Sequence, residues 1–431
     1  MFHRALFMRQ LSEKMIKEWI NQPLPEVFYP REPDLAKYLD IGVKKIVAVT
    51  GFRRVGKTFA LLNLARQIGK DSCLYVNLES ERIPRNVGFL SSLLDTAEEL
   101  FNKKDLVLLL DEVQSIPDWY LWVNRINETT GHRIFISGSS SKLSSAELPT
   151  QLRGRSLEVR VTPLTFLEFL TFKKAPAALL TDADKKRLLR EYLTYGGLPE
   201  IVLAQEGVKY LIVDEYYKTF VQRDVLDRYK IRNDQGLRDL MLVLLNSNYY
   251  TLNSLSKSLK TVQNQLGKAT VSRYMHYLEQ SFFVNSLYVN NKSVKNRLKV
   301  ERKHYFVDGV FISKFSSFSQ NIGRLMEHAV FSRIQKDLFH ESGKEVFYWK
   351  DSAHREVDFV LRDREQVQKL IQVSYLVEGQ AVPEREIIAL VKACKELGCR
   401  ETLLLTWDLD QEFKYGEYNI TLVPLFKWLA D

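Results

Sequence analysis

The chain has 431 residues, of which 45% are hydrophobic and 27% are charged, so it has the composition of a globular protein and the length of several domains. No apolar run is long enough to cross a bilayer, and the N-terminal stretch lacks a continuous apolar core and a small-residue cleavage site, so we expect neither a membrane span nor secretion. The cysteines are too few and too scattered for a disulfide framework, which fits a reducing cytoplasm, and the formal net charge of +9 permits an anionic partner such as nucleic acid.

Residues 1–45 form a lead-in to the rest of the chain. A helical pattern is followed by N-Q-P-L-P-E-V-F-Y-P-R-E-P, whose prolines predict an extended surface segment. The pattern assigns no chemistry to this region.

Residues 46–58 read I-V-A-V-T-G-F-R-R-V-G-K-T, an apolar run that enters a loop of the form G-x-x-x-x-G-K-[ST]. Such a loop cradles phosphates with backbone N–H groups at a helix N-terminus. A chance glycine turn before a helix is the alternative, but it would not require Lys-Thr after the second glycine. The stretch therefore predicts a P-loop for a nucleoside triphosphate.

Each position of this loop has an expected role. Gly51 and Gly56 let the backbone approach the phosphates, Lys57 reaches the β- and γ-phosphates, and the Thr58 hydroxyl binds Mg²⁺. Three further residues complete the predicted nucleotide site: Arg54 and Val55 in the loop, and Phe59 at the start of the following helix.

From residue 46 to residue 163 the chain alternates short apolar runs with helical patterns, which predicts an α/β domain with a buried parallel sheet. The expected strands are 46–49, 73–78, 106–110, 133–137 and 157–161. The expected helices are 59–68, 89–101, 119–128 and 146–152.

The strand L-V-L-L-L ends in Asp111 and Glu112. Ligands of open parallel sheets lie beyond the carboxyl ends of the strands, so both carboxylates are placed near the nucleotide. We expect Asp111 to hold the Mg²⁺ shell and Glu112 to orient the attacking water. The alternative is a pair of exposed carboxylates that cap a strand.

Two polar groups after the next strands are further candidates for catalysis. In I-S-G-S-S-S, Ser139 is favoured over Ser137 as a group that senses the γ-phosphate, although a serine there also suits a turn or a helix N-cap. In Q-L-R-G-R-S, Arg153 and Arg155 are candidates for stabilising transition-state charge in the same or a neighbouring subunit. Arginines also favour helix C-termini for electrostatic reasons alone.

A run of motifs resembles a known family. G-F-R-R-V-G-K-T, L-L-L-D-E-V-Q, I-S-G-S-S-S, L-R-G-R, P-L-T-F-L-E-F-L and Y-G-G-L-P-E, in this order, resemble AAA-type ATPases of archaea and bacteria whose C-terminal domain of unknown function is similar to PD-(D/E)XK nucleases. The resemblance implies an AAA+ core related to the STAND ATPases. It also implies that Gly197 and Pro199 belong to a lid motif near the adenine. Phe52 departs from the proline of many relatives.

Residues 164–233 carry apolar residues at helical spacing and are predicted to form the helical lid. Residues 234–310 predict three short helices and a β-ribbon, which together describe a winged helix. The outward face of its third helix would carry Lys268, Thr270, Ser272, Arg273 and His276.

The segment 292–304 holds six Lys or Arg against one Glu, which suits DNA phosphates. Its candidate DNA contacts, besides Lys268 and Arg273, are Lys292, Lys295, Arg297 and Lys299. A lid component, a protein-docking element or a solvated basic wing is the alternative interpretation.

Residues 311–431 predict a second α/β unit, similar in element order to the nuclease fold named above. By that resemblance, Glu327 and Asp358 match metal-binding acids, whereas Gln372 and Ser374 stand where the family has an acid and a lysine. Lys350 or Lys369 are candidates to replace that lysine. We expect a degenerate domain that faces DNA or forms oligomers and does not cleave.

The sequence therefore predicts an ATPase that uses ATP and Mg²⁺ and couples hydrolysis to movement of its C-terminal half on duplex or branched DNA. Two alternatives stay open: a slowly hydrolysing switch that binds a protein partner, and an ATP-dependent nuclease. A homo-oligomer is compatible with the sequence, and no membrane partner is expected.

Overall fold

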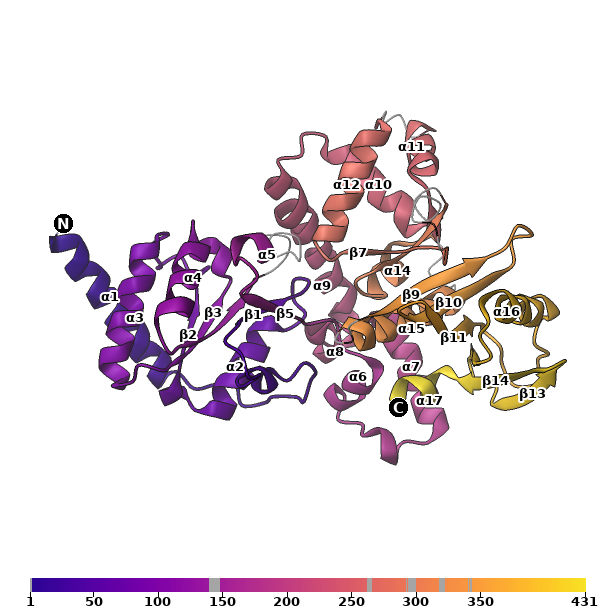
Figure 1. Cartoon of the computed structure of the whole chain (residues 1–431), viewed down its shortest axis with the longest axis horizontal. Coiled ribbons are helices and arrows are strands. Elements are labelled where there is room, and N and C mark those ends of the chain that lie inside the picture. Colours follow the sequence, from indigo (N-terminus) through magenta and orange to yellow (C-terminus); the bar gives the residue numbers. More distant parts are fainter. Residues whose placement is uncertain are drawn as a thin grey trace. The chain divides into compact units, whose positions relative to one another are not determined.

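Figure 1 shows a computed structural model of the chain, which describes residues 2–138, 148–261, 266–291, 293, 300–317, 322–339, 341 and 343–431. The chain divides into two compact units, Met1–Thr162 and Pro163–Asp431. Each unit is described by itself.

The first unit is built on a five-stranded sheet whose strands all run parallel, in the order β2-β3-β4-β1-β5. β1 and β3 are buried at every position, as expected for strands that are covered on both faces. The strands are β1 Ile46–Thr50, β2 Cys73–Asn77, β3 Val107–Asp111, β4 Arg133–Ser137 and β5 Ser156–Arg160.

Helices pack on this sheet and connect its strands. α1 lies against α3 and β2, where the Trp19 indole N–H donates to the carbonyl oxygen of Cys73 at 3.0 Å. α2 contacts β2, β3 and β4, and α4 contacts α3 and β4. The helices are α1 Phe2–Asn21, α2 Lys57–Ile68, α3 Val87–Phe101, α4 Trp119–Thr129 and α5 Leu148–Gln151.

The second unit begins with helices. One long helix was predicted over 208–229, but α9 ends at Thr219 and is followed by a π-helix, Phe220–Asp227. Spacing of apolar residues does not separate these two forms over so short a segment. The α-helices here are α6 Phe166–Phe172, α7 Asp182–Tyr195, α8 Pro199–Leu203 and α9 Glu206–Thr219.

Three helices and a small antiparallel sheet follow. The sheet has the order β6-β8-β7, so β8 is its central strand. Val271, Tyr274, Met275 and Leu278 form the buried face of α12. The elements are α10 Asp234–Leu245, β6 Tyr249–Tyr250, α11 Leu252–Thr261, α12 Lys268–Gln280, β7 Val284–Leu287 and β8 Arg302–Phe306.

The C-terminal part is built on a six-stranded mixed sheet, β13-β14-β12-β11-β10-β9. β11, β12 and β14 are parallel neighbours, and the outer pairs are antiparallel. α16 packs on β10 and β11 and contributes Leu390 and Ala393 to the core. The elements are α14 Val310–Phe315, α15 Ile322–Phe339, β9 Lys344–Lys350, β10 Glu356–Asp363, β11 Gln366–Val373, α16 Glu384–Leu397, β12 Thr402–Thr406, β13 Gln411–Tyr415, β14 Tyr418–Pro424 and α17 Leu425–Ala430.

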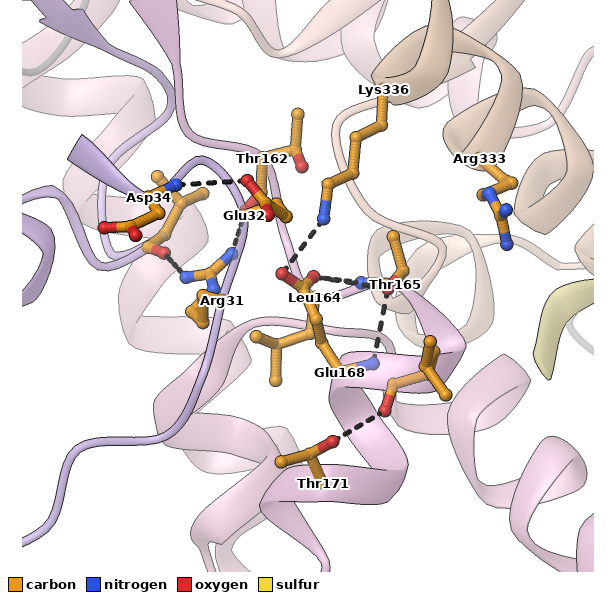
Figure 2. A network of polar contacts seen from close by, with 12 residues as sticks. Arg31, Glu32, Asp34, Thr162, Leu164, Thr165, Glu168, Thr171, Arg333 and Lys336 are labelled. Carbon is orange, nitrogen blue, oxygen red and sulfur yellow. Dashed lines mark hydrogen bonds and ion pairs between the residues drawn. The ribbon is translucent and has the colours of Figure 1, made fainter. Parts of the chain in front are cut away.

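An ion pair joins the first helix of this unit to its C-terminal part. Glu168 closes a capping box with Thr165 at the start of α6, and its carboxylate also binds the Lys336 ammonium of α15 at 2.9 Å (Figure 2). α17 likewise packs on α6 and α7. The helices predicted as a lid are therefore packed against the C-terminal helices.

The predicted fold class is confirmed: the chain has a parallel α/β sheet in its first unit and a separate mixed sheet in its C-terminal part. Within the described ranges, no helix is both long enough and apolar enough to cross a membrane.

Candidate functional site

The glycine-rich loop lies between β1 and α2, at the carboxyl edge of the parallel sheet. Gly51 has a φ of +141°, and a Cβ there would lie 2.2 Å from the carbonyl oxygen of Val161. Gly56 caps α2 with a φ of 101°. Both positions need glycine, because a side chain would collide at the first and strain the backbone at the second.

Lys57 begins α2 and is almost fully buried, at 5% exposure. Its ammonium donates to the carbonyl oxygens of Gly51 at 3.1 Å and Phe52 at 3.0 Å. The Lys57 side chain thus reaches back across the loop, and its ammonium lies against the first two residues of the loop. Val55 is fully buried beneath the same loop, and Arg54 adopts a φ of 67°.

Asp111, at the end of β3, is the centre of a hydroxyl cluster. Thr58 donates to its Oδ2 at 2.7 Å, Tyr75 donates to Oδ2 at 3.0 Å, and Ser137 donates to Oδ1. The three hydroxyls come from α2 and from β2 and β4, the strands on either side of β3. Burial raises the pKa of Asp111 above its usual range, while the Ser137 and Thr58 hydrogen bonds favour its charged form.

Glu112 follows in the left-handed conformation, with a φ of 54°. Its backbone N–H donates to the Ser137 hydroxyl at 3.3 Å, and its carboxylate accepts a hydrogen bond from the Gln114 amide. The chain therefore turns at Glu112, and the Glu112 carboxylate lies beside the Gln114 amide.

Of the two serines considered after β4, Ser137 lies in this cluster, and Ser139 lies outside the described residues. Tyr75 was not predicted. Its signal in the sequence is weak, because a tyrosine in a strand is ordinarily a packing residue.

The two predicted arginines lie at the opposite edge of the sheet. The Arg155 carbonyl accepts from the Ile46 N–H at 2.9 Å, at the amino end of β1, whereas the loop begins after its carboxyl end. Five strand residues span about 16 Å, farther than an arginine side chain reaches. Arg155 forms an ion pair with Glu128, and Arg153 is exposed. Neither residue therefore reaches the phosphate-binding loop of its own chain, and a role in a neighbouring subunit stays a prediction.

An arginine that does lie beside the start of the loop is Arg160, at the end of β5. It pairs in register with Thr50, and its guanidinium is 3.6 Å from the carboxylate of Glu158. Glu158 also accepts from the Thr50 hydroxyl at 2.7 Å. Burial lowers the pKa of Arg160, and the charge of Glu158 opposes that shift.

A second unpredicted residue, Arg31, holds the loop from the N-terminal segment. Its guanidinium donates to the carbonyl oxygen of Val55 and, at 2.6 Å, to that of Thr162 (Figure 2). No role was predicted for this segment, because the contact joins residues that are far apart in the chain.

Phe59 was predicted to line the nucleotide site. Its side chain is 55% exposed and lies against Phe28, with ring centroids 6.3 Å apart. This contact covers only part of the ring, so its role at a nucleotide stays a prediction.

Gly197 and Pro199 belong to the second unit, where Pro199 begins α8. Gly197 donates to Asp308 at 2.8 Å and accepts from the Leu164 N–H at 2.7 Å. A Cβ on Gly197 would lie 2.3 Å from the Leu164 carbonyl oxygen. Local packing is thus a sufficient reason for this glycine, and contact with adenine stays a prediction.

Of the predicted DNA contacts, Lys268 and Arg273 are exposed on α12, together with Ser272 and His276, and Thr270 is half-buried. Lys292, Lys295, Arg297 and Lys299 lie outside the described residues. At the end of that basic segment, Lys303 is buried. It is therefore unable to contact phosphates, contrary to the expectation for this segment as a whole.

Glu327 and Asp358 are brought together by α15 and β10, and both bind the ammonium of Lys303. Gln372 accepts from the Asp358 backbone N–H at 3.2 Å, and Ser374 donates to Glu386 at 3.1 Å. Among the described ion pairs the cation at these acids is Lys303, and Lys350, one of the two expected substitutes with Lys369, pairs with Glu301.

Comparison with known proteins agrees with the geometry of the first unit. Residues 43–170 match a family described as an AAA domain, and residues 186–320 and 322–428 match two domains of unknown function, DUF8612 and DUF4143. Residues 43–170 are thus an AAA-type P-loop domain.

Two proteins with similar sequences are both described as uncharacterized. The uncharacterized protein MJ1544 of Methanocaldococcus jannaschii is 35% identical over 410 residues, or 90% of each chain. An uncharacterized protein of Haemophilus influenzae is 27% identical over 77% of this chain and 82% of that protein. Among solved structures, the Walker-type ATPase PABY2304 of Pyrococcus abyssi is 13% identical with a TM-score of 0.46, over 69% of this chain and 99% of that one.

Proposed function

This chain belongs to the same family as the uncharacterized protein MJ1544 of Methanocaldococcus jannaschii, and from that premise we propose that it is a Mg²⁺-dependent ATPase. One observation carries the proposal: Thr58 and Asp111, the two expected Mg²⁺ ligands, meet at 2.7 Å beside the buried Lys57.

The residues present fit a magnesium ion. Neighbouring ligands of an octahedral Mg²⁺ at about 2.1 Å lie about 3 Å apart, close to the separation of the Thr58 hydroxyl and Asp111 Oδ2. When bound, the ion would neutralise phosphate charge. Tyr75 and Ser137 orient the Asp111 carboxylate toward Thr58.

The protein groups would act mainly by positioning and electrostatics. Lys57 would exchange its two carbonyl partners for phosphate oxygens, to which a charged donor binds more strongly. Glu112 would orient the attacking water and accept its proton, and Gln114 holds that carboxylate in place.

Phosphate release from ATP by the purified full chain tests this proposal. Lys57→Ala should lower ATP affinity at least about tenfold, because it removes charge-assisted bonds worth about 1.5–3 kcal/mol each. Glu112→Gln should leave affinity within about threefold of wild type and slow hydrolysis by about 100-fold or more. If Glu112→Gln hydrolyses ATP at the wild-type rate, Glu112 is not the general base. If Lys57→Ala binds ATP as tightly as wild type, the P-loop assignment is refuted.

We further propose that the second unit is the output of this ATPase and that α10–α12 with the β6-β8-β7 sheet act as a DNA-binding winged helix. The support is the exposed surface of α12, where Lys268 begins the helix and Arg273 lies opposite its apolar buried face. A helix with this division suits a major groove.

A salt titration of duplex binding, followed by fluorescence anisotropy, tests the DNA proposal. The double variant Lys268→Ala/Arg273→Ala should weaken binding and reduce the log–log salt slope by about 1–2. Lys395→Ala/Lys414→Ala, at exposed positions on α16 and β13, is the matched control. Equal slopes for both double variants, or no binding by wild type, would favour the alternative, a nucleotide-gated switch with a protein partner.

A further inference from the structure

A single lysine lies at the centre of three carboxylates in the second unit. Lys303, on β8, is 2% exposed. Its Nζ lies 2.9 Å from Glu327 Oε1, 2.6 Å from Glu356 Oε1 and 2.7 Å from Asp358 Oδ1. An ammonium has three N–H donors, so each one meets a different carboxylate.

Other donors bind the same carboxylates. Tyr305 donates to Glu327 Oε1 at 2.6 Å, and Tyr249 donates to Glu356. The Val373 backbone N–H donates to Asp358 Oδ2 at 2.8 Å. The acids therefore have a satisfied set of protein donors, as buried charged groups require.

Electrostatics favour the charged lysine here. Burial lowers the pKa of Lys303, but the charges of Asp358 and Glu327 more than offset it and raise that pKa well above its usual range. Burial, together with the neighbouring Glu327 and Glu356, raises the pKa of Asp358 to about 7. Lys303 therefore keeps its proton and its positive charge at neutral pH.

The nuclease resemblance implies a divalent cation at Glu327 and Asp358, and the residues present do not fit one. Mg²⁺ would have to lie about 2.0–2.1 Å from its carboxylate oxygens, and that position between the acids is filled by the Lys303 ammonium. Over the part of the chain that the structure describes, no group of three or more His, Cys, Asp or Glu side chains is arranged to hold a metal ion.

We propose that the Lys303 ammonium permanently replaces the divalent cation of this nuclease-like site, so that the site carries no metal-dependent cleavage and instead joins two parts of the second unit. The join runs from the central strand of the β6-β8-β7 sheet to α15 and β10 of the C-terminal part. In this proposal Glu327 and Asp358 bind an ammonium where the nuclease family binds a metal ion.

The wild-type protein provides the first test, with Mn²⁺ as the probe and electron paramagnetic resonance reporting the free ion in the absence of nucleotide. We expect wild type and Asp358→Asn to bind the same number of Mn²⁺ ions per chain. Any Mn²⁺ held near Asp111 is common to both proteins and cancels. An additional ion that wild type binds and Asp358→Asn loses would overturn the proposal, as would Asp358-dependent cleavage of plasmid DNA with Mg²⁺ or Mn²⁺.

The second test removes the ammonium. Lys303→Met keeps the length of the side chain and leaves three carboxylates that are able to close around a cation after shifts of several tenths of an ångström. We expect it to melt at a lower temperature than wild type, to bind one Mn²⁺ more per chain, and to recover several degrees of melting temperature when Mn²⁺ is added. Lys303→Met/Asp358→Asn should lose the extra ion and the recovery. A folded Lys303→Met that binds no extra Mn²⁺ would refute the exchange of cations, and the wild-type test decides the question if this variant does not fold.

Discussion

The guanidinium of Arg31 donates a hydrogen bond to the carbonyl oxygen of Val55, 24 residues further along the chain and inside the phosphate-binding loop. Its second bond, to Thr162, reaches the last residue of the first unit. One side chain therefore connects the loop to the end of the first unit.

Arg31→Met should lower ATP affinity by about tenfold, because a charged hydrogen bond that fixes the loop contributes about 1.5–3 kcal/mol. Isothermal titration with a non-hydrolysable analogue measures the effect. Lys45→Met is the control, since it removes an exposed lysine-to-carbonyl bond in the same unit. A lower melting temperature with unchanged affinity would mean that Arg31 stabilises the unit without shaping the loop.

Tyr75→Phe removes one of the hydroxyls that bind Asp111 and keeps the ring. We expect the Mg²⁺ concentration for half-maximal ATPase activity to rise about threefold to tenfold, since a neutral hydrogen bond contributes about 0.5–1.5 kcal/mol. Tyr120→Phe, at a half-buried tyrosine of α4 whose hydroxyl also bonds an aspartate, is the control. Identical Mg²⁺ curves for both variants would show that Tyr75 only packs.

Gly196→Ala should destabilise the second unit well beyond the cost of its backbone conformation. A Cβ there would lie 1.8 Å from Asp308 Oδ1, and the residue has a φ of +75°. Gly398→Ala is the control for a positive φ alone: Gly398 has a φ of +66° with a ψ of 25° and nothing within 4 Å of a Cβ, whereas Gly196 has a ψ of −166°, so the excess loss at Gly196 contains both the clash and its rarer backbone conformation. We expect urea unfolding to show a loss about 1–3 kcal/mol larger for Gly196→Ala. Equal losses would mean that Asp308 moves aside freely.

His304 should make the second unit sensitive to acid. It is fully buried, its Nε2 donates to the Leu244 carbonyl at 2.8 Å, and its Nδ1 has no partner in the described structure. Burial, with the charge of Arg324, lowers its pKa to about 4 from 6.5. A base with a lowered pKa binds more protons when unfolded, so its contribution to stability is present above pH 6.5 and is lost as the pH falls toward 4.

His304→Gln keeps an N–H donor and cannot titrate. Between pH 7.5 and 4.5, the variant should lose about 2–3 kcal/mol less unfolding free energy than wild type. Urea unfolding at the two pH values measures this difference directly. Parallel losses in the two proteins would rule out His304 as the acid-sensitive group.

The parts of the site that are contiguous in sequence were predictable. Gly51, Lys57 and Thr58 belong to one motif, and Asp111 ends a strand that is buried at all five positions, as in a sheet covered on both faces. The hydroxyl of Tyr75 and the guanidinium of Arg31 reach the site across 36 and 24 residues, and no local pattern marks either contact.

The distance of Arg153 and Arg155 from their own chain's loop has a different cause. β5 runs parallel to β1, so residues that precede it lie at the amino edge of the sheet, opposite the P-loop. The predicted strand 157–161 already implied this position, because the motif L-R-G-R directly precedes that strand. The strand β13 and the π-helix at Phe220–Asp227 had no comparable signal.

Lys303 lies within the DUF8612 match, residues 186–320, and the acids that neutralise it lie within the DUF4143 match, residues 322–428. A fragment that began at residue 322 would keep three crowded carboxylates without their cation, and a fragment that ended at 320 would keep a buried ammonium without its anions. The buried positive charge of the first region is thus neutralised by carboxylates of the second. A boundary between the two regions would therefore separate a buried cation from its buried counter-charges.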